Sequence, residues 1–92
     1  MYGEVRWTDW SEDHIAGHAV TPREVEDVLF ARPRWCAKGR DGTTLVFGTS
    51  TAGRLLLVVT VNEGHGVAFI VTAREMSDQE KRTFRRKVGW TG

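Results

Sequence analysis

Two histidines near the start of the chain have the spacing that brings side chains together on a helix. His14 and His18 are four residues apart, so on a helix they lie on one face. Such a pair can ligate a metal ion, but a closed site needs further ligands, and the remaining histidine, His65, lies in a glycine turn. We therefore expect no metal site. The pair can instead pack or stay solvated, or take part in catalysis or RNA contact, because imidazole exchanges protons near neutral pH.

Charged residues gather at a second place, where an apolar stretch ends. Arg74 follows that stretch directly and is followed by Glu75. A guanidinium at a rigid sheet end can be held for bidentate contact with a phosphate. Arg54, at the start of an adjoining strand, can present a second cation. Alternatively it is a hairpin-end charge or forms a salt bridge with Glu63.

The segment after Glu75 is a predicted basic helix. Lys81 and Arg85 share one of its faces, and the other basic residues are Arg82, Arg86 and Lys87. Such a run is either a solvated helix face or a surface for nucleic acid. Phe84 lies among these residues and can point towards the core or stack on a base.

Other chemistries find little support in the sequence. Ser11 and Ser77 occupy helix-capping positions, and Cys36 lacks any local base that would activate its thiol. The glycines are scattered at turns rather than arranged in a phosphate-binding loop or a dinucleotide fingerprint. We expect no cofactor, and a small-molecule enzyme is a weak third possibility.

The composition fits a small soluble protein. The chain has 92 residues, of which 40% are hydrophobic and 27% charged, so residues 1–92 are expected to form one domain. The single cysteine excludes an internal disulfide and favours a cytoplasmic location. No apolar run is long enough to span a membrane, and the N-terminus does not resemble a signal peptide. Because the formal charge is only +1, any contact with nucleic acid requires a local concentration of positive charge.

The predicted fold is built around one strand. Arg54 to Val61 is almost entirely apolar or β-branched, which predicts a central strand covered on both faces. Leu55 and Leu57 would lie on one face, and Leu56 and Val58 on the other. Glycine-containing turns flank this strand, so it is expected to be the middle of an antiparallel meander.

The remaining elements follow from capping and hydrophobic patterns. Thr21-Pro22-Arg23-Glu24 and Ser77-Asp78-Gln79-Glu80 are capping boxes and predict helices that run to about Ala31 and Lys87. A shorter helix, capped by Asp9 or Ser11, is expected to run to about His18. The further predicted strands are residues 5–7, 35–38, 43–49 and 67–72. The fold class is therefore α+β: an antiparallel sheet of three to five strands with two N-terminal helices and one C-terminal helix.

Several motifs, taken in order, resemble the BrnT family of bacterial toxins. They are His-Ile-x-x-His at 14–18, Val-Thr-Pro-x-Glu-Val-Glu-Asp-Val-Leu-Phe at 20–30, Gly-Arg-Leu-Leu-Leu-Val-Val from 53, Ile-Val-Thr-Ala-Arg-Glu-Met at 70–76 and a Glu-Lys-Arg helix. The resemblance covers residues 7–87. It implies a RelE-like fold, metal-independent ribonuclease activity and a cognate BrnA-type antitoxin, through which alone the complex would bind operator DNA.

The resemblance also implies roles for individual residues. The family's His-Gly-Val segment falls on His18-Ala19-Val20, so Ala19 replaces a glycine, and Phe84 stands where relatives often have tyrosine. By analogy with RelE-type toxins, Arg74 and Arg54 hold the scissile phosphate and His18 or Glu75 moves protons. The residues expected to bind flanking RNA are Lys81, Arg82, Arg85 and His14.

Two hypotheses about function follow. In the first, the chain is an endoribonuclease toxin that acts on RNA, for example ribosome-associated mRNA, and inhibits translation and growth. In the second, it is a catalytically weak or inactive module of the same fold that binds its antitoxin and completes a DNA-binding complex. The missing tyrosine and the low net charge motivate the second. Possible aromatic anchors for a partner are Trp10, Trp35 and Trp90.

Overall fold

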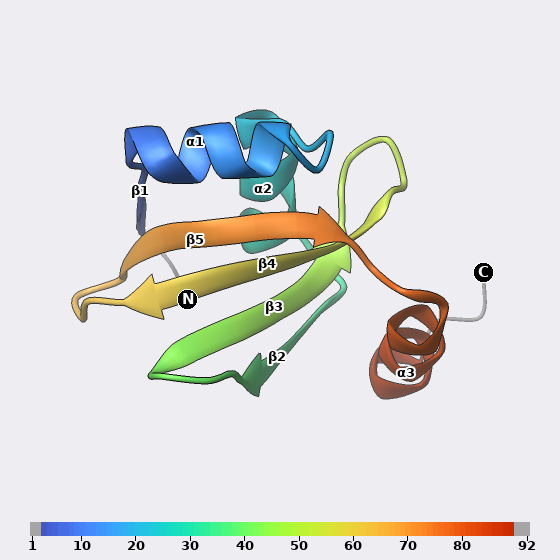
Figure 1. The fold of residues 1–92 in the computed structure, drawn as a ribbon. Coiled ribbons are helices and arrows are strands. Elements are labelled where there is room, and N and C mark those ends of the chain that lie inside the picture. The colour runs from blue at the N-terminus through green and yellow to red at the C-terminus, as the bar shows by residue number, and fades with distance from the viewer. Residues whose placement is uncertain (1–2, 90–92) are drawn as a thin grey trace.

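The computed structural model describes residues 3–89 and contains five strands and three helices (Figure 1). In chain order the elements are β1 (Glu4–Arg6), α1 (Asp9–Ala16), α2 (Pro22–Phe30), β2 (Arg34–Lys38), β3 (Thr43–Thr49), β4 (Leu55–Asn62), β5 (Val67–Glu75) and α3 (Asp78–Val88). The predicted α+β class and the order of the elements are confirmed. Within the described residues no helix is long and apolar enough to cross a membrane.

The strands form one sheet in the order β1-β5-β4-β3-β2, with β4 in the middle. Strands β2 to β5 make the expected antiparallel meander. The prediction of a wholly antiparallel sheet was wrong at one edge, because β1 pairs in parallel with β5. The long connection from β1 through the helices and the meander decides that orientation, so the local sequence of β1 does not show it.

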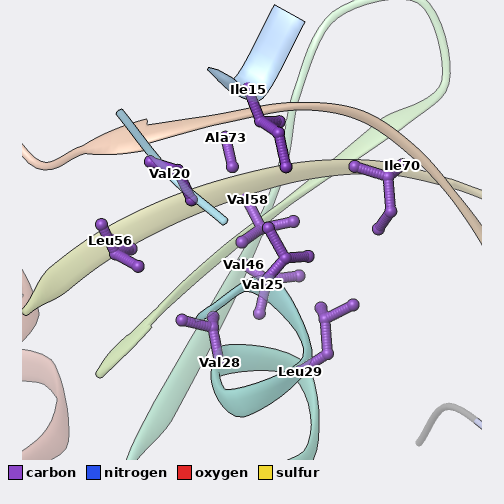
Figure 2. Packing of buried hydrophobic residues seen from close by; sticks show 10 residues of the cluster. All are labelled: Ile15, Val20, Val25, Val28, Leu29, Val46, Leu56, Val58, Ile70 and Ala73. Carbon is purple, nitrogen blue, oxygen red and sulfur yellow. The ribbon is translucent and has the colours of Figure 1, made fainter. Parts of the chain in front are cut away.

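Strand β4 is buried on both faces, as its sequence predicted. Leu56 and Val58 belong to the cluster that α1 and α2 cover (Figure 2). Leu55 and Leu57 belong to a second cluster, which contains Phe84 of α3. In Figure 1, α1 and α2 lie on one side of the sheet, and α3 lies on the other side, beyond the end of β5. The molecule therefore has an α1/α2 face and an α3 face.

The structure confirms both predicted capping boxes. Thr21 caps α2 with Glu24 as the reciprocal partner, and Ser77 caps α3 with Glu80. The predicted start of α1 was wrong. Thr8 is the cap, and Ser11 is the reciprocal partner inside the helix, because a hydroxyl can replace the usual glutamate in this exchange.

The aromatic side chains differ in how far they are buried. Phe84 is fully buried, so it packs in the core and does not offer its ring to a base. Trp35 of β2 stacks on Phe47, with ring centroids 4.8 Å apart. Trp10 of α1 is 59% exposed and can serve as an anchor for a partner, whereas Trp90 lies outside the described residues.

Candidate functional site

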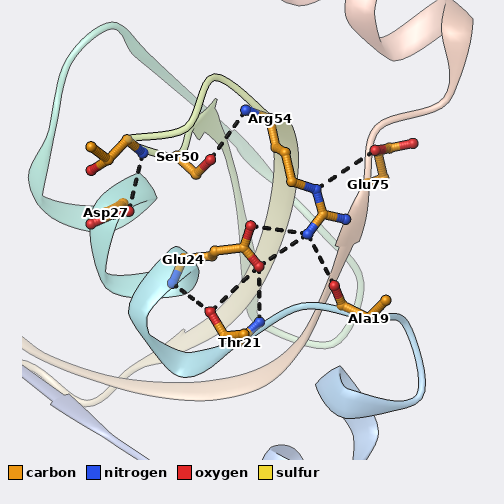
Figure 3. Close-up of polar contacts among 8 residues, drawn as sticks. Ala19, Thr21, Glu24, Asp27, Ser50, Arg54 and Glu75 are labelled. Carbon is orange, nitrogen blue, oxygen red and sulfur yellow. Dashed lines mark hydrogen bonds and ion pairs between the residues drawn. The ribbon is translucent and has the colours of Figure 1, made fainter.

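Arg54 lies immediately before β4 and is bound by groups from three other segments. Its Nη1 donates hydrogen bonds to both carboxylate oxygens of Glu24, at 3.0 and 2.9 Å, and to the carbonyl oxygen of Ala19, at 2.9 Å (Figure 3). Its Nε lies 3.8 Å from the carboxylate of Glu75. The alternative of a salt bridge with Glu63 was wrong. Arg54 thus joins α2, the turn after α1 and the end of β5.

Glu24 performs two tasks in this cluster. It completes the capping box of α2 by accepting from the backbone N–H of Thr21 at 3.0 Å, and it accepts from Arg54. Burial raises the pKa of Glu24, but the hydrogen bonds from Thr21 and Arg54 outweigh burial, so the pKa lies below its usual value. Glu24 is therefore an ion-pair partner and not a proton donor near neutral pH.

The turn after α1 places His18 beside this cluster. The N–H of Val20 donates to the carbonyl oxygen of Ile15, and the N–H of Ala19 donates to that of Ala16, which is the hydrogen-bond pattern of a Schellman turn. Ala19 has a φ of 57°, in the left-handed region that favours glycine. The exposed side chain of His18 therefore precedes the residue whose carbonyl binds Arg54.

Arg74 near the end of β5 forms a second ion pair. Its Nη1 and Nη2 donate to the two carboxylate oxygens of Glu80 at 2.7 and 2.9 Å, and Nη1 also donates to the carbonyl oxygen of Glu75 at 3.1 Å. Glu80 is the capping-box glutamate of α3. Their hydrogen bonds lower the pKa of Glu80 and raise that of Arg74. The sequence predicted that Arg74 would bind a phosphate in bidentate fashion, but in the structure its guanidinium binds the carboxylate of Glu80 in this way.

The two arginines do not share a face of the sheet. Arg74 is the register partner of Leu57, whose side chain lies on the α3 face, and it binds Glu80 at the start of α3. Arg54 contacts α2 and the turn after α1, on the opposite face. The expectation that both hold one phosphate was therefore wrong for this arrangement, because alternate positions along a strand point to opposite sides.

The sequence-predicted site residues consequently form two groups at the same end of the sheet. The carbonyl oxygen of Leu55 accepts a hydrogen bond from the backbone N–H of Met76, so the start of β4 and the end of β5 are adjacent. The group on the α1/α2 face is Arg54, Glu75, His18 and His14. The group on the α3 face is Arg74, Lys81, Arg82 and Arg85; Arg82 and Arg85 are exposed, and Lys81 is half-buried.

The histidines form an aromatic row along α1 and the turn that follows. The ring of Trp10 stacks on that of His14, with centroids 4.5 Å apart, and His14 meets His18 edge-on at 5.5 Å. Helix α1 lies on the other side of the sheet from the basic helix α3, with which the sequence had grouped His14 (Figure 1). In residues 3–89, no cluster of three or more His, Cys, Asp or Glu side chains could hold a metal ion.

Charge is divided between the two faces. Helices α1 and α2 contain six carboxylates (Asp9, Glu12, Asp13, Glu24, Glu26 and Asp27) and one arginine, Arg23. Helix α3 contains five basic and two acidic residues. Residues 32–40, which include edge strand β2, contain four basic residues and no acidic one. The net charge of +1 therefore conceals a basic surface on α3 and around β2, the local concentration that binding of nucleic acid requires.

Sequence reasoning identified Glu24 and Glu80 only as caps and missed their role as arginine partners. The capping motif shows where each glutamate lies on its helix, but it does not show which arginine from the sheet will approach that glutamate. Sequence reasoning also gave no role to Arg32 and Arg34, which flank Pro33 where β2 begins.

Comparison with known proteins identifies the fold. No family model matches the sequence, and no curated protein matches it. Among solved structures, the fold is shared by a ribonuclease toxin. That protein is BrnT of Brucella abortus, which superimposes with a TM-score of 0.66 over 82% of this chain and 97% of its own, at 14% sequence identity. The predicted BrnT-like fold is thus confirmed. A sequence identity of 14% supports similarity of fold and nothing further.

Proposed function

We propose that this chain is a metal-independent endoribonuclease and the toxin of a toxin-antitoxin pair. The observation that carries the proposal is the match of its fold to a ribonuclease toxin over nearly the whole of that toxin's length. The basic surface on α3 and around β2 supports it, because RNA binding needs concentrated positive charge and the molecule supplies this despite a low net charge.

Metal-independent RNA cleavage sets three chemical tasks. The 2′-hydroxyl must lose a proton, the negative charge of the phosphorane must be stabilised, and the 5′-oxygen must gain a proton. We assign charge stabilisation to Arg74, which lies on the same face as the basic helix. His18 and Glu75, the groups that the resemblance implies for proton transfer, are exposed at the same end of the sheet but lie on the opposite face from Arg74, so we assign them no step. Flanking phosphates would meet Lys81, Arg82 and Arg85.

On this proposal an antitoxin neutralises the chain, and contact with operator DNA occurs only through that partner. The antitoxin surface is assigned to the α1/α2 face, because its exposed Trp10 and its carboxylates suit a basic protein segment and repel RNA. RNA and antitoxin would then use different faces of the molecule.

A second function is favoured by one specific observation. Arg54 and Arg74 are both bound by carboxylates, so a phosphate must compete with Glu24 or Glu80 for either guanidinium. Phe84, in place of a tyrosine, is fully buried and supplies no phenolic proton. These features suit a catalytically weak module that binds its antitoxin and completes a DNA-binding complex.

Growth after induced expression separates the two functions. The wild-type chain should arrest growth and degrade RNA, and co-expression of the neighbouring open reading frame should relieve both effects. Arg74→Ala should abolish arrest. Glu80→Gln breaks the same ion pair while keeping the guanidinium, so it should retain arrest. Normal growth and intact RNA with soluble, folded wild-type protein would leave the binding module as the better account.

A further inference from the structure

A shallow pocket of about 430 Å³ lies between the segment that leads from α2 into β2 and the last turn of α3. The described residues that line it are Arg32, Pro33, Arg34, Lys87 and Val88. Three of these five side chains are cationic and none is acidic. The pocket is separate from both arginine–glutamate pairs described above and contains none of the residues assigned to catalysis.

Two of the three cations are held in place by the fold. The guanidinium of Arg34 donates a hydrogen bond from Nη1 to the carbonyl oxygen of Leu29, near the C-terminal end of α2. The ammonium group of Lys87 lies 5.6 Å from the centre of the Trp35 ring, within the range of a cation–π contact. Because these contacts order the side chains in advance, an anion that enters the pocket loses less free energy to side-chain ordering.

The third cation, like Lys87, is exposed. Arg32 lies on the surface at the pocket's edge and is separated from Arg34 by Pro33, whose ring restricts the backbone between them. Guanidinium groups present planar sets of N–H donors that suit phosphate oxygens. Among the described residues, the pocket therefore brings together two guanidiniums and one ammonium.

We propose that this pocket binds a backbone phosphate of single-stranded RNA. This inference rests on the proposed function and extends it. The pocket is continuous with α3, where Glu80 holds Arg74 near the first turn and Lys87 lies near the last. The seven residues of helix between them span about 10 Å. A strand bound at Arg74 can thus reach the pocket within a few nucleotides.

An acidic protein segment is the rival occupant, and the charge pattern favours RNA over it. The basic residues extend beyond the pocket along α3, where Arg82, Arg85 and Arg86 are exposed. A track of phosphates, with one charge per nucleotide, matches such an extended array. The ring of Trp35 is already occupied by Phe47 and Lys87, so the pocket is suited to phosphate rather than to base stacking.

Binding of an oligonucleotide that cannot be cleaved tests this inference apart from catalysis. The probe is a fluorescent 2′-O-methyl RNA of about 12 nucleotides, within the range of single-strand sites. Its affinity for the full chain is measured by anisotropy at several salt concentrations. Arg32→Gln and Lys87→Gln should each weaken binding about fivefold at low salt and reduce the slope of log K against log salt by about 0.7.

The matched control is Arg23→Gln, which removes one positive charge from an exposed side chain of α2 on the other face. It should change affinity less than twofold. Equal effects on affinity in the pocket variants and the control would overturn the inference. So would a glutamate-rich peptide that binds wild type more tightly than the oligonucleotide does and whose binding is weakened by the same variants. RNA cleavage is measured separately. If the pocket variants weaken binding but wild type does not cleave RNA, the proposed function is contradicted and the pocket is not. If wild type cleaves RNA but the pocket variants bind as wild type does, the pocket is contradicted and the proposed function is not.

Discussion

Arg54 and Arg74 each bind the glutamate that completes a capping box, Glu24 in α2 and Glu80 in α3. Each arginine thereby fastens the start of a helix to the same end of the sheet. This pairing gives both arginines a structural task, so their substitution affects stability as well as any reaction. Activity measured with an arginine variant must therefore be compared with a variant of its glutamate partner.

The Arg74–Glu80 pair should contribute to stability in a pH-dependent way. Glu80→Gln keeps a capping side chain, since glutamine also serves in the capping box, but removes the charge. Both side chains are partly exposed, at 41% and 25%, so the expected loss near pH 7 is about 0.5 to 1 kcal/mol.

The lowered pKa of Glu80 fixes the direction of the pH effect. A depressed carboxyl pKa stabilises the fold above the unfolded-state value of about 4.3, and this contribution is lost as pH falls through the folded-state pKa. Urea unfolding should therefore separate wild type from Glu80→Gln at pH 7 and by a smaller margin at about pH 3. An equal difference at both pH values would contradict this account of the pair.

Ala19 occupies a backbone conformation that suits glycine better. A residue with a Cβ is destabilised in the left-handed region by about 1 to 2 kcal/mol. Glycine avoids this cost but loses more chain entropy on folding, which offsets about 0.5 to 1 kcal/mol of the gain. Ala19→Gly should therefore stabilise the protein by up to about 1 kcal/mol, measured by urea unfolding. Ala16→Gly, at the last residue of α1, should instead destabilise it by about 0.5 to 1 kcal/mol. A loss of stability in Ala19→Gly would show that the turn is not strained by its alanine.

At the scale of elements, the parts that were predicted are those whose signals are local. The capping boxes gave the starts of α2 and α3, and the two apolar faces of Leu55 to Val61 gave the central strand. The face on which Arg54 or Arg74 would lie and the parallel pairing of β1 could not be read locally, because register and topology are set by distant partners. The candidate site was therefore predicted as a set of residues but not as an arrangement.

The approach of α2 to the sheet depends on Gly48 in β3. A Cβ at this position would lie 3.0 Å from Cγ1 of Val28 and 3.5 Å from its carbonyl oxygen, closer than packed carbon atoms normally come. Gly48→Ala should destabilise the fold by about 1 to 3 kcal/mol, because α2 must move.

The control for this substitution is Gly17→Ala. Gly17 has φ −62° and ψ −20°, and the nearest atom to an added Cβ is the carbonyl oxygen of His14 at 3.4 Å. This change should be neutral or stabilising by up to about 1 kcal/mol. Denaturant midpoints that fall equally for both variants would contradict the close packing of α2 on β3.

At the scale of the whole molecule, the separation of charge matters more than the net charge. Helices α1 and α2, which contain the carboxylates, lie on one side of the sheet, and the basic helix α3 lies on the other (Figure 1). A field of this kind orients a polyanion towards one side of the protein and a basic partner towards the other. On the proposed function, RNA and the antitoxin would thereby bind different faces of the chain.

Reversing one charge on each face tests this separation. Arg82→Glu and Arg23→Glu change the net charge equally, and both side chains are exposed. Only Arg82→Glu should weaken binding of single-stranded RNA, with a fall of roughly 0.7 to 1 in the salt slope if one phosphate contact is lost. Similar anisotropy curves for the two variants would show that RNA responds to net charge alone.

The most direct test of ribonuclease activity is cleavage of RNA by the purified chain in the presence of EDTA. Wild type should cleave the RNA. Arg74→Ala should lower the cleavage rate at least about a hundredfold, because it removes a group that stabilises transition-state charge. Glu80→Gln should retain most of the wild-type rate. The contrary result is an Arg74→Ala protein that cleaves as fast as wild type, or folded wild-type protein that leaves RNA intact, with and without ribosomes.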